Sequence, residues 1–441
     1  MKRADILHSI VWKKYIRMPY GHLLDYASPD GNTVFPTVEQ CESDFPNPMG
    51  WWTPSENGSF FTGLYLAALT ERYKLNPDEK TASEINLLVK GLFLNQDVSE
   101  VDGFIARGVA DDGISHYKLS SEDQVGPWVY GLWCAYESDA TDKTVKEEIK
   151  KHISREMEGL YRNGFDIPCE MAGYTWGSFI HGDFRGCAKL LGCVMAAYRI
   201  TGEHKWLEIY EKLAEEKPDG ILTRADILRY GLAPDMVKNN GLIQFWIHAC
   251  AHLFLEKLAE YDEKRRGIYN QALENNSAVA VKFLDGYKTY LSAERLVFDT
   301  DWTKLSHLYK KPKNPTDGMN IALEQNRFWM SKIVPERHIE HNVLGNMLFA
   351  SVICLTSGNS DIFETAKNIL YSASDEINWE KLNLSYAFVA ESAVYYSLRK
   401  DKLNKQIPGR FVRGFPVCKH IDLCGSYTKA AAFRAKSNNI A

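Results

Sequence analysis

The amino-acid sequence predicts an all-α fold, because helices that are apolar on nearly every side alternate along the chain with amphipathic helices. Helices inside a protein are apolar all round, whereas helices at the surface carry one apolar stripe and one solvated face. Two concentric rings satisfy both patterns, so the expected architecture is an (α/α)6 toroid of six inner and six outer helices. The expected inner helices lie near residues 56–74, 122–138, 178–200, 240–260, 337–356 and 384–399.

The expected outer helices are charged segments that lie between the apolar ones. They cover residues 3–18, 82–94, 143–161, 204–216, 265–284 and 361–374. Two stretches do not read as helical: residues 102–118, where Asp112-Gly113 is a good hairpin turn pair, and a Pro/Lys/Asp-rich excursion over 287–335. The toroid is expected to span residues 1–400, followed by a basic C-terminal tail over 401–441.

The bulk composition excludes several function classes. Hydrophobic residues make up 45% of the chain and charged residues 25%, as in ordinary globular proteins. The net charge of −5 gives no basic field for nucleic acid. The longest apolar run, residues 343–355, is shorter than the roughly 18–20 residues that cross a bilayer. We therefore expect neither a nucleic-acid nor a membrane partner.

The N-terminal residues lack the continuous apolar core and the small-residue cleavage site of a signal peptide. A cytoplasmic and a periplasmic location are both compatible with this sequence. The oligomeric state is open as well, and a homodimer is one of the options.

The cysteines and histidines give no sign of a metal site. Nine cysteines are scattered without any CxxC pair, which favours reduced thiols in the core over disulfides or metal ligands. His248 and His252 are four residues apart, but neither an HExxH glutamate nor a third ligand accompanies them. No GxGxxG, GxxxxGK[ST] or GxSxG motif occurs, so no metal and no cofactor is expected.

The start of the first apolar helix combines helix-capping residues with residues that bind sugars. Thr53, Pro54 and Glu56 fit a capping box with proline at the first helical position. In a toroid the inner helices start at one mouth, so Glu56 and Asn57 would also line that mouth. Trp51 and Trp52 would offer flat faces for stacking on sugar rings. Glu56 is therefore either a helix cap or a site carboxylate.

The second apolar helix has a similar start. Ser120, Ser121 and Asp123 resemble the residue pattern of a capping box. Asp123 is therefore either a helix cap or a carboxylate that faces the cavity of the toroid. Upstream, Asp111 and Asp112 read as turn residues. Arg107 lies in an apolar run and offers a bidentate fork for a carboxylate. The other candidates for substrate binding beside this helix are His116, Tyr117 and Gln124.

Two further helix starts are rich in polar and aromatic residues. The segment before residue 190 holds Trp176 and His181, with Tyr174, Asp183 and Arg185 beside them. The segment before residue 345 holds His338 and His341, three apart on one face, with Glu336, Arg337 and Glu340. At each place, a structural network and a binding site are both compatible with the pattern.

Residues 47–69 and 104–133 resemble glycoside hydrolase family 154, which includes exo-acting β-glucuronidases, and more distantly the unsaturated glucuronyl hydrolases. The resemblance extends to residues 204–213, and beyond them only the helical pattern agrees. It implies a toroid that acts on carbohydrate, and it assigns no acid or nucleophile. The aromatic-Arg-Gly pattern of the unsaturated glucuronyl hydrolases is absent here. The most specific matches are Arg107, Gly108, Asp112, Gly113, His116, Tyr117, Asp123 and Gln124.

The resulting expectation is an exo-acting glycoside hydrolase that removes a terminal uronic acid. Glycosidases need two carboxyl groups, and Glu56 and Asp123 form the expected pair. Asp123, with a pKa raised by burial near aromatic residues, would be the acid, and Glu56 the base or nucleophile. Arg107 would hold the sugar carboxylate, with His116 and His341 beside it.

Two other functions fit the same residues. A polysaccharide lyase would use Asn57 or an arginine to neutralise the uronate, and Tyr117, His181 or His341 as the base. A glycan-binding toroid without activity would use the polar clusters only for affinity and capping.

Overall fold

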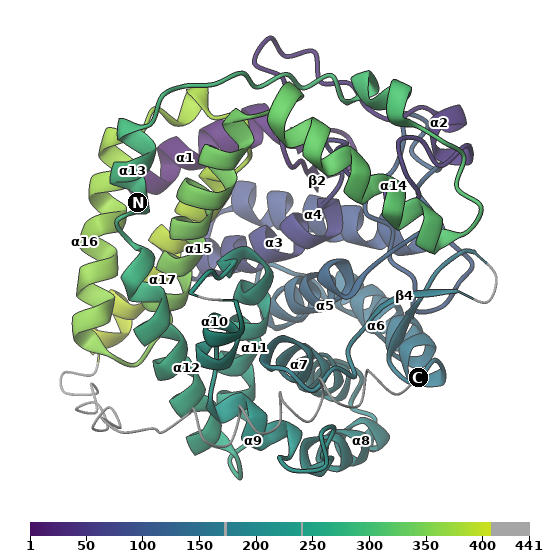
Figure 1. Cartoon of the computed structure of the whole chain (residues 1–441). Helices are drawn as coiled ribbons and strands as arrows, with labels where there is room; N and C mark the ends of the chain where they lie inside the picture. The colour runs from purple at the N-terminus through teal and green to yellow at the C-terminus, as the bar shows by residue number, and fades with distance from the viewer. Residues whose placement is uncertain (172–173, 240, 407–441) are drawn as a thin grey trace.

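The structure is a computed structural model that describes residues 1–171, 174–239 and 241–406, and it is mostly helical (Figure 1). The all-α prediction is confirmed. In the described part of the chain the strands form two small antiparallel pairs, β1 (Ile16–Arg17) with β2 (His22–Leu23) and β3 (Asp166–Pro168) with β4 (Thr175–Ser178).

Each of the six predicted apolar segments contains a helix that is buried on nearly all sides. Consecutive members of this set contact each other in chain order, and the last, α17, also contacts the first, α3. The fifth segment begins as a π-helix over His338–Gly345 and continues as an α-helix. The six are α3 (Gly58–Leu75), α5 (Glu122–Glu137), α7 (Phe184–Thr201), α11 (Phe245–Tyr261), α15 (Asn346–Leu355) and α17 (Ala387–Gln406).

The six predicted amphipathic helices are also confirmed, and each packs its apolar stripe on a buried helix. In α6, for example, Ile149, Ile153 and Met157 recur every four residues on one face and are fully buried. Figure 1 shows most of these helices at the periphery. They are α1 (Lys2–Lys14), α4 (Glu79–Asp97), α6 (Lys143–Arg162), α8 (His204–Glu215), α12 (Arg266–Ala280) and α16 (Ser360–Glu376).

Helices α3 and α5 approach each other at glycines. A Cβ atom on Gly63 would lie 2.2 Å from the carbonyl oxygen of Pro127, and one on Gly131 would lie 2.4 Å from that of Gly63. Real side chains do not tolerate such distances, so only glycine allows this backbone contact. The close packing holds the N-terminal ends of the two helices next to each other, where the candidate site lies.

The space between the buried helices is filled by aromatic rings. The ring of Phe388 on α17 lies 5.1 Å from that of Phe61 on α3 and 6.3 Å from that of Phe349 on α15. Phe60 contacts Trp246 of α11 at 5.7 Å. These rings belong to the first turns of their helices, so the layer lies directly beneath the polar groups at the helix starts.

The prediction that residues 287–335 are not helical is wrong. The region contains α13 (Gly286–Ser292), a 3-10 helix (Trp302–Leu308), α14 (Pro315–Phe328) and a π-helical turn (Trp329–Ile333). Asn314 caps α14 and Pro315 opens it, a start signal that the overall Pro/Lys composition obscured. Trp302 and Trp329 are buried in one cluster with Trp52, so this region covers the start of α3.

Two smaller expectations also need correction. Residues 102–118 form no strand: the turn at Gly113 has φ +73° and Ala110 N–H donates to Ser115 O at 2.7 Å, but no ladder follows. The predicted tail boundary at residue 400 falls inside α17, which continues to Gln406. Residues 407–441, with the rest of the predicted tail, lie outside the described residues. The short helices α2 (Val38–Glu42), α9 (Arg224–Arg229) and α10 (Ala233–Lys238) complete the fold.

The described cysteines are free and buried, as the sequence predicts, at positions 41, 134, 169, 187, 193, 250 and 354. Cys418 and Cys424 lie outside the described residues. Within the part of the chain that the structure describes, no helix combines the length and apolar character needed to cross a bilayer.

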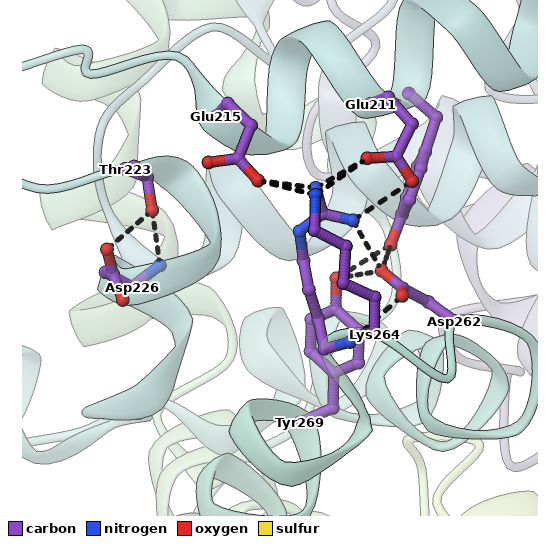
Figure 2. A network of polar contacts seen from close by, with 9 residues as sticks. Glu211, Glu215, Thr223, Asp226, Asp262, Lys264 and Tyr269 are labelled. Carbon is purple, nitrogen blue, oxygen red and sulfur yellow. Dashed lines mark hydrogen bonds and ion pairs between the residues drawn. The ribbon is translucent and has the colours of Figure 1, made fainter.

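A buried ion network ties α8 to the start of α12 (Figure 2). The Arg265 guanidinium, 3% exposed, lies 2.7 Å from Glu211 and Glu215 and 3.0 Å from Asp262. Asp262 also accepts hydrogen bonds from the hydroxyls of Tyr210 and Tyr269, at 2.7 and 3.2 Å. One arginine therefore forms ion pairs with three carboxylates where α8 meets the start of α12.

Arg265→Met should destabilise the fold by about 2–3 kcal/mol. This is less than the roughly 3–5 kcal/mol lost when a fully buried pair is broken, because Glu211 and Glu215 reach solvent. Lys264 contacts the same two glutamates but its side chain is 64% exposed, so Lys264→Met should cost about 0.5 kcal/mol or less. Urea unfolding of both variants tests the comparison, and equal losses would contradict it.

Candidate functional site

Four charged side chains from distant parts of the chain meet around the N-terminal end of α3. We call Asp25, Glu56, Arg107 and Arg337 the carboxyl–guanidinium cluster. Asp25 follows β2, Glu56 precedes α3, Arg107 lies in the loop before α5, and Arg337 precedes the π-helix at His338. Asp25 interacts electrostatically with Glu56 and Arg337, and Arg107 with both carboxyl groups. Tyr386, just before α17, interacts with Arg337, Asp25 and Glu56.

Asp25 is the buried carboxyl group of the cluster and is not among the site residues that the sequence predicts. Its residue is 3% exposed, and its two Oδ atoms accept hydrogen bonds from the backbone N–H and the side-chain amide of Asn57, both at 2.8 Å. Burial, and then the negative charge of Glu56, raise the pKa of Asp25 to about 8 against the opposing effect of Arg337. Asp25 therefore holds a proton near neutral pH.

Glu56 does not form the predicted capping box. Helix α3 begins at Gly58, and its N-cap Asn57 makes no side-chain cap bond. The hydroxyl of Thr53 donates to Gly50 O at 2.7 Å instead of accepting from residue 56. Glu56 accepts the backbone N–H of Trp52 at 2.8 Å. The segment from Trp51 to Asn57 is a series of turns, which leaves the half-buried Glu56 carboxylate beside the cluster.

The two guanidiniums of the cluster are buried, and neither forms an ion pair with a carboxylate among the residues that the structure describes. Arg107 is 5% and Arg337 8% exposed. Arg107 donates to Glu56 O at 3.0 Å and to Ser121 Oγ at 3.3 Å, and Arg337 lies 5.8 Å from the ring centre of Trp52. Neither Nε has a hydrogen-bond partner among the described residues. A buried guanidinium with unused N–H groups is suited to bind an anion.

Asp123 contradicts two expectations, since it neither caps α5 nor has a raised pKa. Its carboxylate lies 2.5 Å from Lys189 Nζ and 3.8 Å from Arg185 of α7. Burial alone would raise the pKa of Asp123, but Lys189 and Arg185 outweigh it and lower the pKa. Gly126 makes room for this lysine, because a Cβ atom there would lie 3.2 Å from Lys189 Cδ. An ionised carboxylate held by two cations is not a proton donor.

Aromatic and imidazole groups complete the surroundings of the cluster. The rings of Trp51 and Trp52 meet edge to face at 5.8 Å. His341 Nδ1 forms a hydrogen bond with the hydroxyl of Tyr386, and its ring lies 5.3 Å from that of Trp246. Burial, and then Arg337, lower the pKa of His341 to about 3. The His341 imidazole is therefore neutral.

The remaining predicted site residues have other partners. Gln124 is fully buried, accepts Phe60 N–H and donates to Asn57 Oδ1. The hydroxyl of Tyr117 donates to Phe45 O at 2.6 Å, and His116 Nε2 lies 3.0 Å from Glu170. Gln124 thus contacts Asn57 beside the cluster, whereas Tyr117 and His116 contact Phe45 and Glu170; their predicted part in substrate binding stays a prediction.

Three predicted residues show no contact with the cluster in the described structure. Trp176 on β4 packs on the small core that contains Met49 and Leu119, as Trp51 also does, but it does not reach the four charged groups. His181 and His338 are exposed, and His338 pairs with Asn342. The structure therefore brings together Trp51, Trp52, Glu56, Asn57, Arg107 and His341, and adds Asp25, Arg337 and Tyr386.

The described residues contain no group of three or more His, Cys, Asp or Glu side chains placed to hold a metal ion. His248 lies 3.2 Å from Asp235, and His252 bonds to Thr356 and Asn276. Both histidines are satisfied by protein groups.

Comparisons with family models, with curated proteins and with solved structures found no match. The resemblance to glycoside hydrolases therefore stays a prediction, and the function has to be argued from the cluster.

The raised pKa of Asp25 should make the effect of Asp25→Asn on stability depend on pH. A carboxyl group with a higher pKa in the folded chain binds more protons when folded, so its contribution to stability is lost as the pH rises from 3.8 to about 8. Relative to wild type, Asp25→Asn should gain about 1–3 kcal/mol between pH 5 and pH 8. Urea unfolding at both pH values tests this, and a pH-independent difference would contradict it.

Proposed function

We propose that the protein is an exo-acting glycoside hydrolase that removes a terminal uronic acid from an oligosaccharide, at the mouth of an (α/α)6 toroid. The toroid is supported by the contacts of α3, α5, α7, α11, α15 and α17, which run in chain order and return from α17 to α3. The outer layer is supported by the amphipathic helices that pack on each of them. The carboxyl–guanidinium cluster would then lie where the inner helices begin.

The observation that carries the proposal is the pair of unlike carboxyl groups. Asp25 is buried and has a pKa of about 8, whereas Glu56 is half-buried and accepts a backbone N–H. Glycosidases use a protonated carboxyl group as the acid and an ionised one as the base or nucleophile. We assign the acid to Asp25, in place of Asp123, and keep Glu56 as the base or nucleophile.

In this mechanism Asp25 donates its proton to the glycosidic oxygen as the bond to the leaving sugar breaks. Glu56 either attacks the anomeric carbon or removes a proton from the attacking water. The negative charge of Glu56 supports protonation of Asp25, because it is one of the causes of the raised pKa. When Glu56 becomes neutral during the reaction, that support is lost and Asp25 becomes a stronger acid.

The buried guanidiniums support a uronic acid as the sugar. Arg107 and Arg337 each have an Nε–H without a partner among the described residues and lie beside Asp25 and Glu56, and a sugar carboxylate accepts charge-assisted hydrogen bonds from guanidinium groups. A sugar carboxylate would give the two guanidiniums a direct ion partner, whereas they now interact with Asp25 and Glu56 only through longer-range attraction. Trp51 and Trp52 would provide the apolar faces that the ring packs against.

The lyase alternative has less support. A lyase needs a base with an accessible lone pair and a pKa near its usual value. The pKa of His341 is lowered to about 3, so its imidazole is a poor base. Tyr117 donates its hydroxyl to a backbone carbonyl. A binding protein without activity would use the same cluster, and turnover separates it from an enzyme.

Asp25→Asn should reduce turnover of a glucuronide by about 10²–10⁴-fold, the usual contribution of general acid catalysis, and Glu56→Gln should reduce it at least as much. Asp123→Asn is the matched control, because it removes a carboxylate that pairs with Lys189. If Asp123 takes no part in proton transfer, this variant should retain more than about a tenth of the wild-type turnover. Released monosaccharide is measured together with ultraviolet absorbance, which a lyase product would show.

The same assay tests the choice of sugar. Wild type should prefer an aryl glucuronide over the matched glucoside, and Arg107→Met should raise KM for the glucuronide by about 10–100-fold, as expected for a lost charged hydrogen bond. Full turnover by Asp25→Asn combined with loss in Asp123→Asn would restore Asp123 as the acid. Saturable binding of uronides without any product would favour the binding protein.

A further inference from the structure

The N-terminal ends of α5, α7 and α11 carry charged and aromatic side chains that the proposed mechanism does not use. Helix α7 contacts both α5 and α11 (Figure 1). Arg107 of the carboxyl–guanidinium cluster interacts electrostatically with Asp123 and Glu122 of α5. The same guanidinium interacts with Glu56 and Asp25. One buried arginine therefore adjoins both groups of charges.

Arg185, in the first turn of α7, has a guanidinium that is partly exposed and donates no hydrogen bond to a described residue. Its side chain is 26% exposed and lies 3.3 Å from Glu122 and 3.8 Å from Asp123, and the geometry of neither contact makes a hydrogen bond. Burial alone would lower the pKa of Arg185, but these carboxylates raise it. Arg265, by contrast, donates hydrogen bonds to three carboxylates. The N–H groups of Arg185 are thus free to bind a ligand.

The carboxylate of Glu122 is the acceptor beside this guanidinium. Its side chain is 14% exposed, and it accepts no hydrogen bond from another residue of the described chain. Asp123, next along α5, is instead held by the ammonium group of Lys189 at 2.5 Å. Gly177 of β4 leaves room for Glu122, because a Cβ atom there would lie 2.2 Å from Glu122 Oε2. A donor fork and an acceptor thus lie side by side, a combination that suits hydroxyl groups.

Trp246, in the first turn of α11, lies near both groups of charges. Its ring is partly exposed and is 5.3 Å from that of His341 beside the cluster. His248, two residues later, lies 3.2 Å from Asp235, and Asp235 interacts electrostatically with Arg185. An indole ring offers a large flat apolar face, which suits the C–H face of a sugar ring.

The charges around Arg185 disfavour a second acidic sugar. Its guanidinium interacts with four carboxylates, those of residues 122, 123, 183 and 235. Lys189 is a further cation in contact with this group. The carboxylates outnumber these two cations, so a uronate at this place would be repelled. Neutral hydroxyls would find both donors and acceptors.

We propose that Arg185, Glu122 and Trp246 bind a neutral sugar on the leaving side of the substrate, the part that is released when the uronic acid is removed. This inference rests on the proposed function, and it makes the substrate a uronide of a neutral sugar. The fork of Arg185 donates to neighbouring hydroxyls of that sugar, Glu122 accepts from one of them, and the ring packs on Trp246.

The rates of hydrolysis of two substrates test the proposal. Methyl β-glucuronide has no leaving-side sugar, whereas a disaccharide of glucuronic acid β-linked to glucose has a neutral one. Wild type should show about 10-fold or more higher kcat/KM for the disaccharide, and Arg185→Met and Glu122→Gln should each lower this ratio by about 10-fold, as expected for lost hydrogen bonds to charged groups. Arg199→Met is the matched control, because Arg199 lies in the last turn of α7 beside Tyr261; it should keep the ratio within about 2-fold of wild type.

Binding to Asp25→Asn separates this inference from the proposed function, because isothermal titration needs no turnover. In this background, Arg185→Met should weaken binding of the disaccharide by about 10-fold more than binding of methyl glucuronide. If wild type releases no product but this contrast is found, the hydrolase proposal fails and the sugar site stands. Equal weakening of both ligands, no weakening, or no binding of either would overturn the inference.

A disaccharide of two glucuronic acids tests the assignment of a neutral sugar. It should bind at least about 10-fold more weakly than the disaccharide with glucose, because its second carboxylate meets the carboxylates around Arg185. Tighter binding would overturn the assignment. Melting temperatures of all variants without ligand show whether the fold is kept, and Glu122→Gln, which preserves side-chain size, provides the test if Arg185→Met does not fold.

Discussion

The buried carboxyl group of Asp25 connects the segments that form the candidate site. Its backbone N–H donates to Pro54 O at 2.8 Å, and its carbonyl accepts Ser385 N–H at 2.9 Å. Its two carboxyl oxygens hold the backbone and the side chain of Asn57. One residue thus ties the segment before α3 to the segment before α17, and the positions of Glu56 and Tyr386 depend on it.

The burial of Asp25 and of the two arginines explains both the chemistry of the site and why the site lowers the stability of the fold. Removing Asp25 from water favours its protonated form, whereas Arg107 and Arg337 keep buried positive charges that form no ion pair within the described part of the chain. Such an arrangement does not stabilise a fold by itself. It is held by the surrounding packing, which includes the glycine contacts of α3 with α5 and the cluster of Trp52, Trp302 and Trp329. A substrate that brings its own carboxylate would compensate the guanidiniums.

The helices could be predicted from the sequence because burial follows the helical period over many residues, as in α6. The absence of the capping box could not be predicted, because Thr53 and Glu56 have the right spacing. The chain turns at Trp52, directly before Thr53, where φ is +77°, and the helix begins only at Gly58. The ionisation of Asp123 depends on Lys189, which lies 66 residues later in the chain and so could not be recognised as its partner from the sequence. Asp25 gave only a weak signal, one acidic residue in the apolar run 22–28, and its importance comes from contacts with segments far away in sequence.

A titration of Asp25 itself tests the account most directly. In protein labelled with 13C at the aspartate carboxyl carbons, the resonance lost in Asp25→Asn identifies the group, and its shift is followed against pH. We expect a midpoint near 8 in wild type and a lower one in Glu56→Gln, still above the ordinary 3.8 because burial remains. A midpoint at or below 3.8 in wild type, or one that Glu56→Gln leaves unchanged, would contradict the coupled carboxyl pair on which the proposed function rests.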